Sequence, residues 1–146
     1  MPAYVRQAPP RWFGVVAVLL ILWGLAGIFA FYSDVSMNET RLAAMSEYDR
    51  AFYRSRPGWF VWIYGIATWS GLFGAVALWL RRRLARPLFI LSLVAVVVQF
   101  GWVFLATDIV AAKGAVAVLP FPLLILGIAI VQISLATRGW RRGWLQ

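Results

Sequence analysis

The stretch 78–93 reads LWLRRRLARPLFILSL and places four arginines within six residues, between two strongly apolar segments. These segments, 59–80 and 87–107, contain no Asp, Glu, Lys or Arg. A helix rises about 1.5 Å per residue, so a segment of this length crosses a bilayer core of about 30 Å. We therefore predict two membrane-spanning helices joined by a short loop, with Pro87 favouring the start of the second helix.

Two further segments, 13–32 and 116–137, have the same length and the same lack of charge. Hydrophobic residues make up 63% of the 146 residues and charged residues only 13%. A soluble domain needs a more polar surface than this composition provides. The sequence predicts an all-α membrane protein, in which residues 1–146 form a single membrane domain built as a bundle of four transmembrane helices.

The charges are distributed unequally between the two ends of the predicted bundle. Nine arginines and no acidic residue fall on the side of the chain termini and the 81–86 loop: Arg6, Arg11, Arg81, Arg82, Arg83, Arg86, Arg138, Arg141 and Arg142. On the opposite side, five acidic and five basic residues balance. The positive-inside rule then predicts two cytoplasmic termini, with Arg81, Arg82, Arg83 and Arg86 as the topology anchor. Anionic lipid headgroups account for these arginines, so we expect no nucleic-acid partner.

The loop between the first two spans has the pattern of an amphipathic helix over about 38–55. Ser36 or Asn38 provides an N-cap, and Pro57 limits its other end. We predict that this helix lies at the outer membrane interface. Asp49 falls within its apolar arc, and a buried carboxylate needs a cation, so we predict a pair with Arg56. The alternative is that Asp49 points into the mouth of the bundle.

Small residues gather on one face of the 59–80 helix. They are Ala67, Gly71, Gly74 and Ala75, and the opposite face carries large side chains such as Trp62, Trp69 and Phe73. In a bilayer, small residues four apart allow helix backbones to approach closely. We predict that the small face packs inside the bundle and that the aromatic face meets lipid or a partner protein.

One polar cluster is expected inside the membrane. At similar depths on three helices lie Tyr64, Thr68, Gln99, Trp102 and Trp23. An amide in hydrocarbon must find hydrogen-bond partners, so a contact between Gln99 and Thr68 that joins two helices is the preferred interpretation. The alternative is a small-molecule site. Gln132 is expected nearer the cytoplasm, outside the cluster.

The chain contains neither cysteine nor histidine, and the predicted spans carry no carboxylate. The usual metal ligands, haem ligands and general bases are therefore missing from the membrane region. We expect no enzymatic activity, no metal and no cofactor.

Several short motifs carry a resemblance to a protein family. They are LWGLAG at 22–27, SRPGW at 55–59, SGLFGA at 70–75, and LRRRLARPLFILSL at 80–93, followed by Gln99. The chain resembles small bacterial four-helix inner-membrane proteins, some of which are labelled "sugar transporter". The resemblance implies a multi-pass protein of the bacterial inner membrane, and it carries over no catalytic residue.

Two functional hypotheses follow. The preferred one is a non-catalytic helix-bundle protein that associates with itself or acts as an accessory subunit of a larger membrane complex. The alternative is a transporter or facilitator of a small, sugar-like solute that works as an oligomer. A filled interface with Gln99 bonded to a neighbouring helix would favour the first hypothesis. A cavity that reaches Gln99 from the outer face and is lined by Tyr64, Thr68 and Trp102 would favour the second.

Overall fold

The computed structural model describes residues 7–146, so the predicted anchor residue Arg6 lies outside the described residues. The helices of the described part are, in chain order, α1 (Arg11–Val35), α2 (Glu39–Ala44), α3 (Glu47–Ser55), α4 (Trp59–Trp79), α5 (Ala85–Ala106), α6 (Ile109–Lys113), α7 (Ala115–Val118) and α8 (Pro120–Arg141). Four of them, α1, α4, α5 and α8, are long and apolar enough to cross a membrane. The predicted all-α membrane fold with four spanning helices is confirmed.

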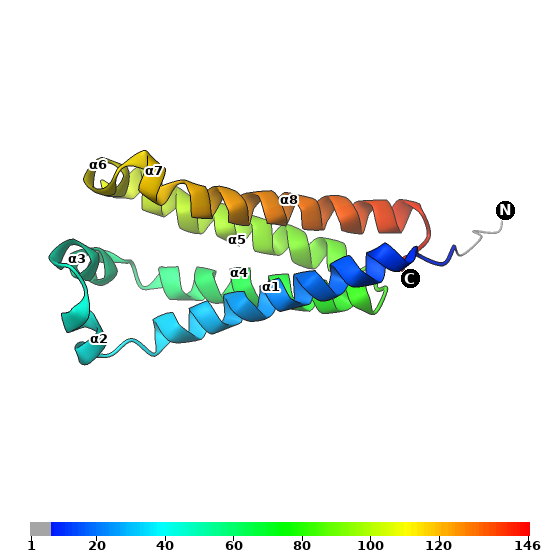
Figure 1. Cartoon of the computed structure of the whole chain (residues 1–146), viewed down its shortest axis with the longest axis horizontal. Coiled ribbons are helices and arrows are strands. Elements are labelled where there is room, and N and C mark those ends of the chain that lie inside the picture. Colours follow the sequence, from blue (N-terminus) through cyan, green and yellow to red (C-terminus); the bar gives the residue numbers. More distant parts are fainter. Residues whose placement is uncertain (1–6) are drawn as a thin grey trace.

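The spanning helices pack in the order α1, α4, α5, α8, as Figure 1 shows. The two ends of the bundle differ. One end carries the arginines of 81–86 and 138–142 and is called the arginine end below. The other end carries α2, α3, α6 and α7 and is called the cap end. From the arginine end, where they lie close together, α1 and α8 diverge toward the cap end (Figure 1).

The main apolar core, of aliphatic and aromatic side chains, fills the arginine end. Its most deeply buried large side chains are Phe13, Leu78, Phe89 and Leu145. Trp144 folds back on the bundle, and its ring lies 5.3 Å from that of Phe13. The residues after α8 also bond to the loop between α4 and α5: the Gln146 N–H donates to the Arg81 carbonyl at 2.7 Å. This core closes the arginine end of the bundle.

Small residues allow the close helix packing. A Cβ atom on Gly74 would lie 2.7 Å from the Phe89 ring, so α4 and α5 approach more closely there than an alanine permits. A Cβ atom on Gly24 of α1 would lie 3.0 Å from the Leu72 backbone of α4. Ala67 and Ala75 are buried on the same side of α4, while Trp62, with 76% of its surface exposed, points away.

The predicted helix over about 38–55 is instead two helices, α2 and α3. Asn38 caps α2, because its side-chain oxygen accepts a hydrogen bond from the Arg41 N–H at 2.9 Å. The chain then turns extended at Met45, and Ser46 caps α3 by accepting from the Asp49 N–H at 3.1 Å. The serine in the middle of the segment therefore starts a second helix.

The predicted fourth span also begins at a different residue. Residues 115–118 form the separate short helix α7, and α8 begins at Pro120 rather than at residue 116. A proline lacks the N–H of a helix interior but fits the first turn, which explains a new start at this position. This shift of four residues changes the depth of every side chain on α8.

Candidate functional site

A cavity of about 420 Å³ lies between the four spanning helices, in the half of the bundle nearer the cap end. Its walls are mostly apolar, and its lining residues include no charged side chain. Polar groups come from Tyr64 and Thr68 of α4, Ser92 and Gln99 of α5, and Gln132 of α8. The cavity ends toward the arginine end, where the main apolar core begins.

The two small hydroxyls of the wall already have partners. The Thr68 hydroxyl donates to the Tyr64 carbonyl at 3.0 Å, one turn earlier in α4. The Ser92 hydroxyl donates to the Ala67 carbonyl at 2.7 Å and so joins α5 to α4. A hydrogen bond to a backbone carbonyl, whether of the same helix or of a neighbouring one, satisfies a hydroxyl inside a membrane. Neither hydroxyl therefore needs a ligand as a hydrogen-bond acceptor.

The two glutamines differ from the hydroxyls. Within residues 7–146, the side chains of Gln99 and Gln132 make no hydrogen bond. Both line the cavity, and Gln132 is only 4% exposed. The predicted contact between Gln99 and Thr68 is thus not formed as a hydrogen bond. Thr68 bonds to its own helix instead.

The expectation that Gln132 lies outside the cluster is wrong. It was based on a span that starts at residue 116, which places Gln132 about 24 Å from that end. Because α8 starts at Pro120, Gln132 lies only about 18 Å down, level with Trp23 on α1. Both residues line the cavity.

Trp102 is the predicted cluster member that does not line the cavity. It lies closer to the cap end, with its ring 5.4 Å from Phe60 of α4 and 6.0 Å from Phe52 of α3. Trp102 therefore packs between α5 and the cap helices. Of the predicted cluster, Trp23, Tyr64, Thr68 and Gln99 line the cavity, together with Gln132.

The predicted pair between Asp49 and Arg56 is not formed. Asp49 instead binds Lys113 of α6, whose hydrogen bond holds the pKa of Asp49 below its ordinary value. Arg56 follows the end of α3 in an extended conformation and turns toward α1. There its two terminal nitrogens bind the Asp34 carboxylate at 3.0 and 3.1 Å.

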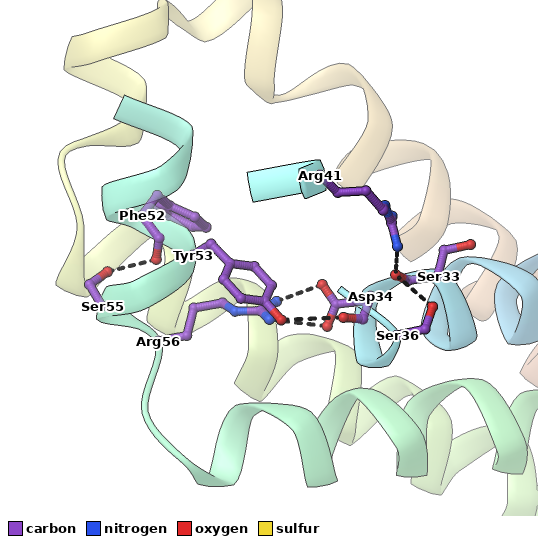
Figure 2. Close-up of polar contacts among 8 residues, drawn as sticks. All are labelled: Ser33, Asp34, Ser36, Arg41, Phe52, Tyr53, Ser55 and Arg56. Atoms are coloured by element: carbon purple, nitrogen blue, oxygen red, sulfur yellow. Dashed lines mark hydrogen bonds and ion pairs between the residues drawn. The ribbon is translucent and has the colours of Figure 1, made fainter. Parts of the chain in front are cut away.

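No sequence pattern marks Asp34 as a site residue, although it is the acidic residue at the end of a long apolar span. Figure 2 shows its carboxylate facing Arg56, with the Tyr53 hydroxyl donating to the Asp34 carbonyl at 3.3 Å. The Arg56 guanidinium also lies over the rings of Tyr53 and Phe60, at 4.2 and 4.8 Å. This cluster fixes the cap to α1 and α4 near the cavity.

The anchor arginines lie around the opposite end. Arg83 and Arg86 lie over the Trp140 ring, at 5.8 and 5.0 Å from its centre. Arg81 donates from its Nε to the Trp144 carbonyl at 3.1 Å, and Arg82 is exposed. These residues hold the arginine end closed and present positive charge there, far from the cavity.

Across residues 7–146, no group of three or more Asp, Glu, His or Cys residues is arranged to hold a metal ion. No family model matches the chain, and neither a curated protein nor a solved structure matches it.

Proposed function

We propose that this protein is a non-catalytic carrier that holds a small uncharged molecule between its four spanning helices. The observation that carries the proposal is the cavity of about 420 Å³ that reaches Gln99 and Gln132. Ligand sites in proteins are typically concave, mostly apolar and furnished with a few polar groups, and this cavity has that character. Of the two functional hypotheses, the cavity favours the small-molecule alternative over a bundle that only packs.

The shape of the bundle suggests how a carrier would work. The cavity lies near the cap end, and buried side chains such as Leu78 and Leu145 close the arginine end. Transport would require a second state in which the helices part at the arginine end. The contact between α1 and α8 there, where Gly139 lies beside Phe13, is the natural place for such a change.

A self-associating or accessory protein is the second candidate. Trp62, Trp69 and Phe73 form an exposed aromatic face on α4, with the rings of Trp69 and Phe73 5.5 Å apart. Aromatic side chains are enriched in protein interfaces. Because four helices are about half of a typical carrier, a dimer through this face is also compatible with transport.

The motif resemblance and the charge distribution support the proposed location. We place the protein in the bacterial inner membrane, with the arginine end in the cytoplasm and the cap end outside. The cavity would then be nearer the outer face. Membrane lipids surround the exposed aliphatic faces of all four spans.

The proposal is tested by extracting the protein into polymer nanodiscs and measuring bound small molecules by native mass spectrometry. Ala129 lines the cavity, so Ala129→Phe should fill part of it and reduce the co-purifying mass. Val131 lies two residues away on an exposed part of α8, so Val131→Phe is the matched control and should retain it. Equal occupancy in the two variants would overturn the proposal.

A further inference from the structure

We infer that the cavity takes a lipid-soluble, uncharged molecule whose carbonyl or hydroxyl group pairs with Gln132. This inference rests on the proposed function and names the class of ligand. It is carried by three observations on the described residues: the wall lacks charge, its unsatisfied polar groups are few, and one of them is a deeply buried amide.

The uncharged wall excludes ionised ligands. The charged residues nearest to the cap side of the cavity, Asp34 and Arg56, already neutralise each other. A charge buried in an apolar site needs a paired opposite charge, and the lining offers none. Organic acids, amines and phosphate esters are therefore poor ligands for this site.

The small number of free polar groups argues against a sugar. With Thr68 and Ser92 bonded to backbone carbonyls, the remaining polar side chains of the wall are mainly Tyr64, Gln99 and Gln132. A sugar carries hydroxyls around its whole ring, and each one that is buried without a partner weakens binding. An apolar molecule with one or two polar groups matches this wall better.

Gln132 provides the hydrogen-bond partner for the polar end of the ligand. The residue is 4% exposed and lines the cavity, and its side chain has no hydrogen-bond partner among residues 7–146. An amide in this position can donate to a carbonyl and accept from a hydroxyl. A phospholipid acyl chain would bring only a methyl group to this depth and would leave the amide unpaired. The ligand must therefore enter far enough to place a polar group beside Gln132.

The route of entry lies between α1 and α8, where the two helices diverge (Figure 1). Phe121 lines the cavity and is 64% exposed, and Ala26 and Ala30 of α1 are exposed lining residues. These side chains belong to apolar spans, and in the proposed membrane placement they face the bilayer. A ligand dissolved in the membrane can thus reach the cavity sideways. The cavity volume of about 420 Å³ is large enough for such a ligand, because a cavity of about 150 Å³ already binds benzene.

The experiment uses a photoreactive long-chain alcohol as the probe, with the full chain in nanodiscs. After illumination, mass spectrometry should find adducts on cavity residues such as Trp23, Phe100 and Ile125. Unlabelled alcohol should compete, an alkane of the same length should compete about tenfold less well, and glucose should not compete. Gln132→Leu should abolish the preference for alcohol over alkane, whereas Val131→Leu should keep it.

Each other outcome overturns the inference in a distinguishable way. If glucose displaces the probe, the ligand class is wrong, but the cavity still binds a small molecule. Equal competition by alcohol and alkane in the unmodified protein would exclude the role of Gln132 without any variant. If no cavity residue is labelled and Ala129→Phe keeps its co-purifying mass, both the inference and the proposed function fail.

Discussion

Arg56 binds Asp34 through both terminal guanidinium nitrogens and so ties the segment after α3 to the end of α1. Both side chains are largely buried, with exposures of 11% and 16%. The guanidinium is also stacked on Tyr53 and Phe60. This pair is the main charged contact between the cap and the bundle in the described part of the chain. Because it lies on the cap side of the cavity, a loss of the pair would loosen the cap next to the candidate site.

Breaking this pair should destabilise the protein strongly. Asp34→Ala leaves the Arg56 charge buried without a partner, so we expect a loss of about 3 kcal/mol in the free energy of unfolding. Unfolding in detergent measures it. Glu39→Ala is the control, because the Arg54–Glu39 pair is 60% and 89% exposed and should change stability by less than about 1 kcal/mol. Similar losses would show that Asp34 is not part of a buried pair.

The close approach of α4 and α5 makes Gly74 sensitive to a single added carbon. In Gly74→Ala the new methyl group would meet the Phe89 ring at 2.7 Å, so we expect a loss of about 1 to 3 kcal/mol. Gly101 on α5 has no atom within 4 Å of an added Cβ, so Gly101→Ala should be neutral or slightly stabilising. Thermal unfolding of the two variants decides the question. A stable Gly74→Ala protein would contradict the packing described.

The pair between Asp49 and Lys113 should make the cap weakly dependent on pH. The hydrogen bond from Lys113 lowers the pKa of Asp49 in the folded protein below its ordinary value of 3.8. The contribution is therefore present above that value and is lost as the pH falls through the folded-state pKa. Both side chains are partly exposed, so it should amount to less than about 1 kcal/mol.

Thermal unfolding against pH tests this link between α3 and α6. Asp49→Asn should remove the contribution of this pair to the acid-dependent loss of stability, and Lys113→Gln should remove the same contribution, because each takes away one partner. Combining the two substitutions should add nothing further. If the double variant loses as much again as either single variant, the two residues act separately.

The spanning helices could be predicted from the sequence because charge-free runs of this length have one physical explanation in a bilayer. The small face of Ala67, Gly71 and Gly74 could be predicted from helical spacing, because small residues about one turn apart allow helix backbones to approach closely in a bilayer. Ion pairs were harder to predict. Arg56 follows the predicted helix seven residues after Asp49, yet the turn after α3 carries Arg56 to Asp34 and leaves Asp49 to Lys113.

The cavity could not be predicted from residue types alone. Facing surfaces of small residues either close up or leave a space, and the tilt between α1 and α8 decides which. The position of Gln132 depended on one residue, since Pro120 and not residue 116 begins α8. A last span that starts at Pro120 places Gln132 level with Trp23.

The orientation in the membrane can be tested by cysteine labelling, because the chain has no natural cysteine. Ala43 and Leu84 are exposed at opposite ends of the bundle. An impermeant thiol reagent added to intact cells should label Ala43→Cys and spare Leu84→Cys, since the arginine end is expected in the cytoplasm. After membrane permeabilisation both should react. Labelling of Leu84→Cys alone in intact cells would reverse the topology.

The final prediction concerns Gln99, which lines the cavity without a hydrogen bond to another described residue. If it were a link between helices, Gln99→Leu would break a bond and cost about 1 kcal/mol. Because Thr68 is bonded to Tyr64 instead, we expect no loss of stability and even a gain of up to about 1 kcal/mol, since an unpaired amide is removed from an apolar wall.

The same substitution should weaken ligand binding, because the amide is one of the few groups able to bond a polar ligand in the cavity. Detergent unfolding and the nanodisc measurement of co-purifying mass, made on one preparation of Gln99→Leu, separate the two roles. A protein of unchanged stability with reduced occupancy supports a ligand site. A protein that loses stability but keeps its bound mass would show that Gln99 joins helices, and the cavity function would then rest on Gln132 alone.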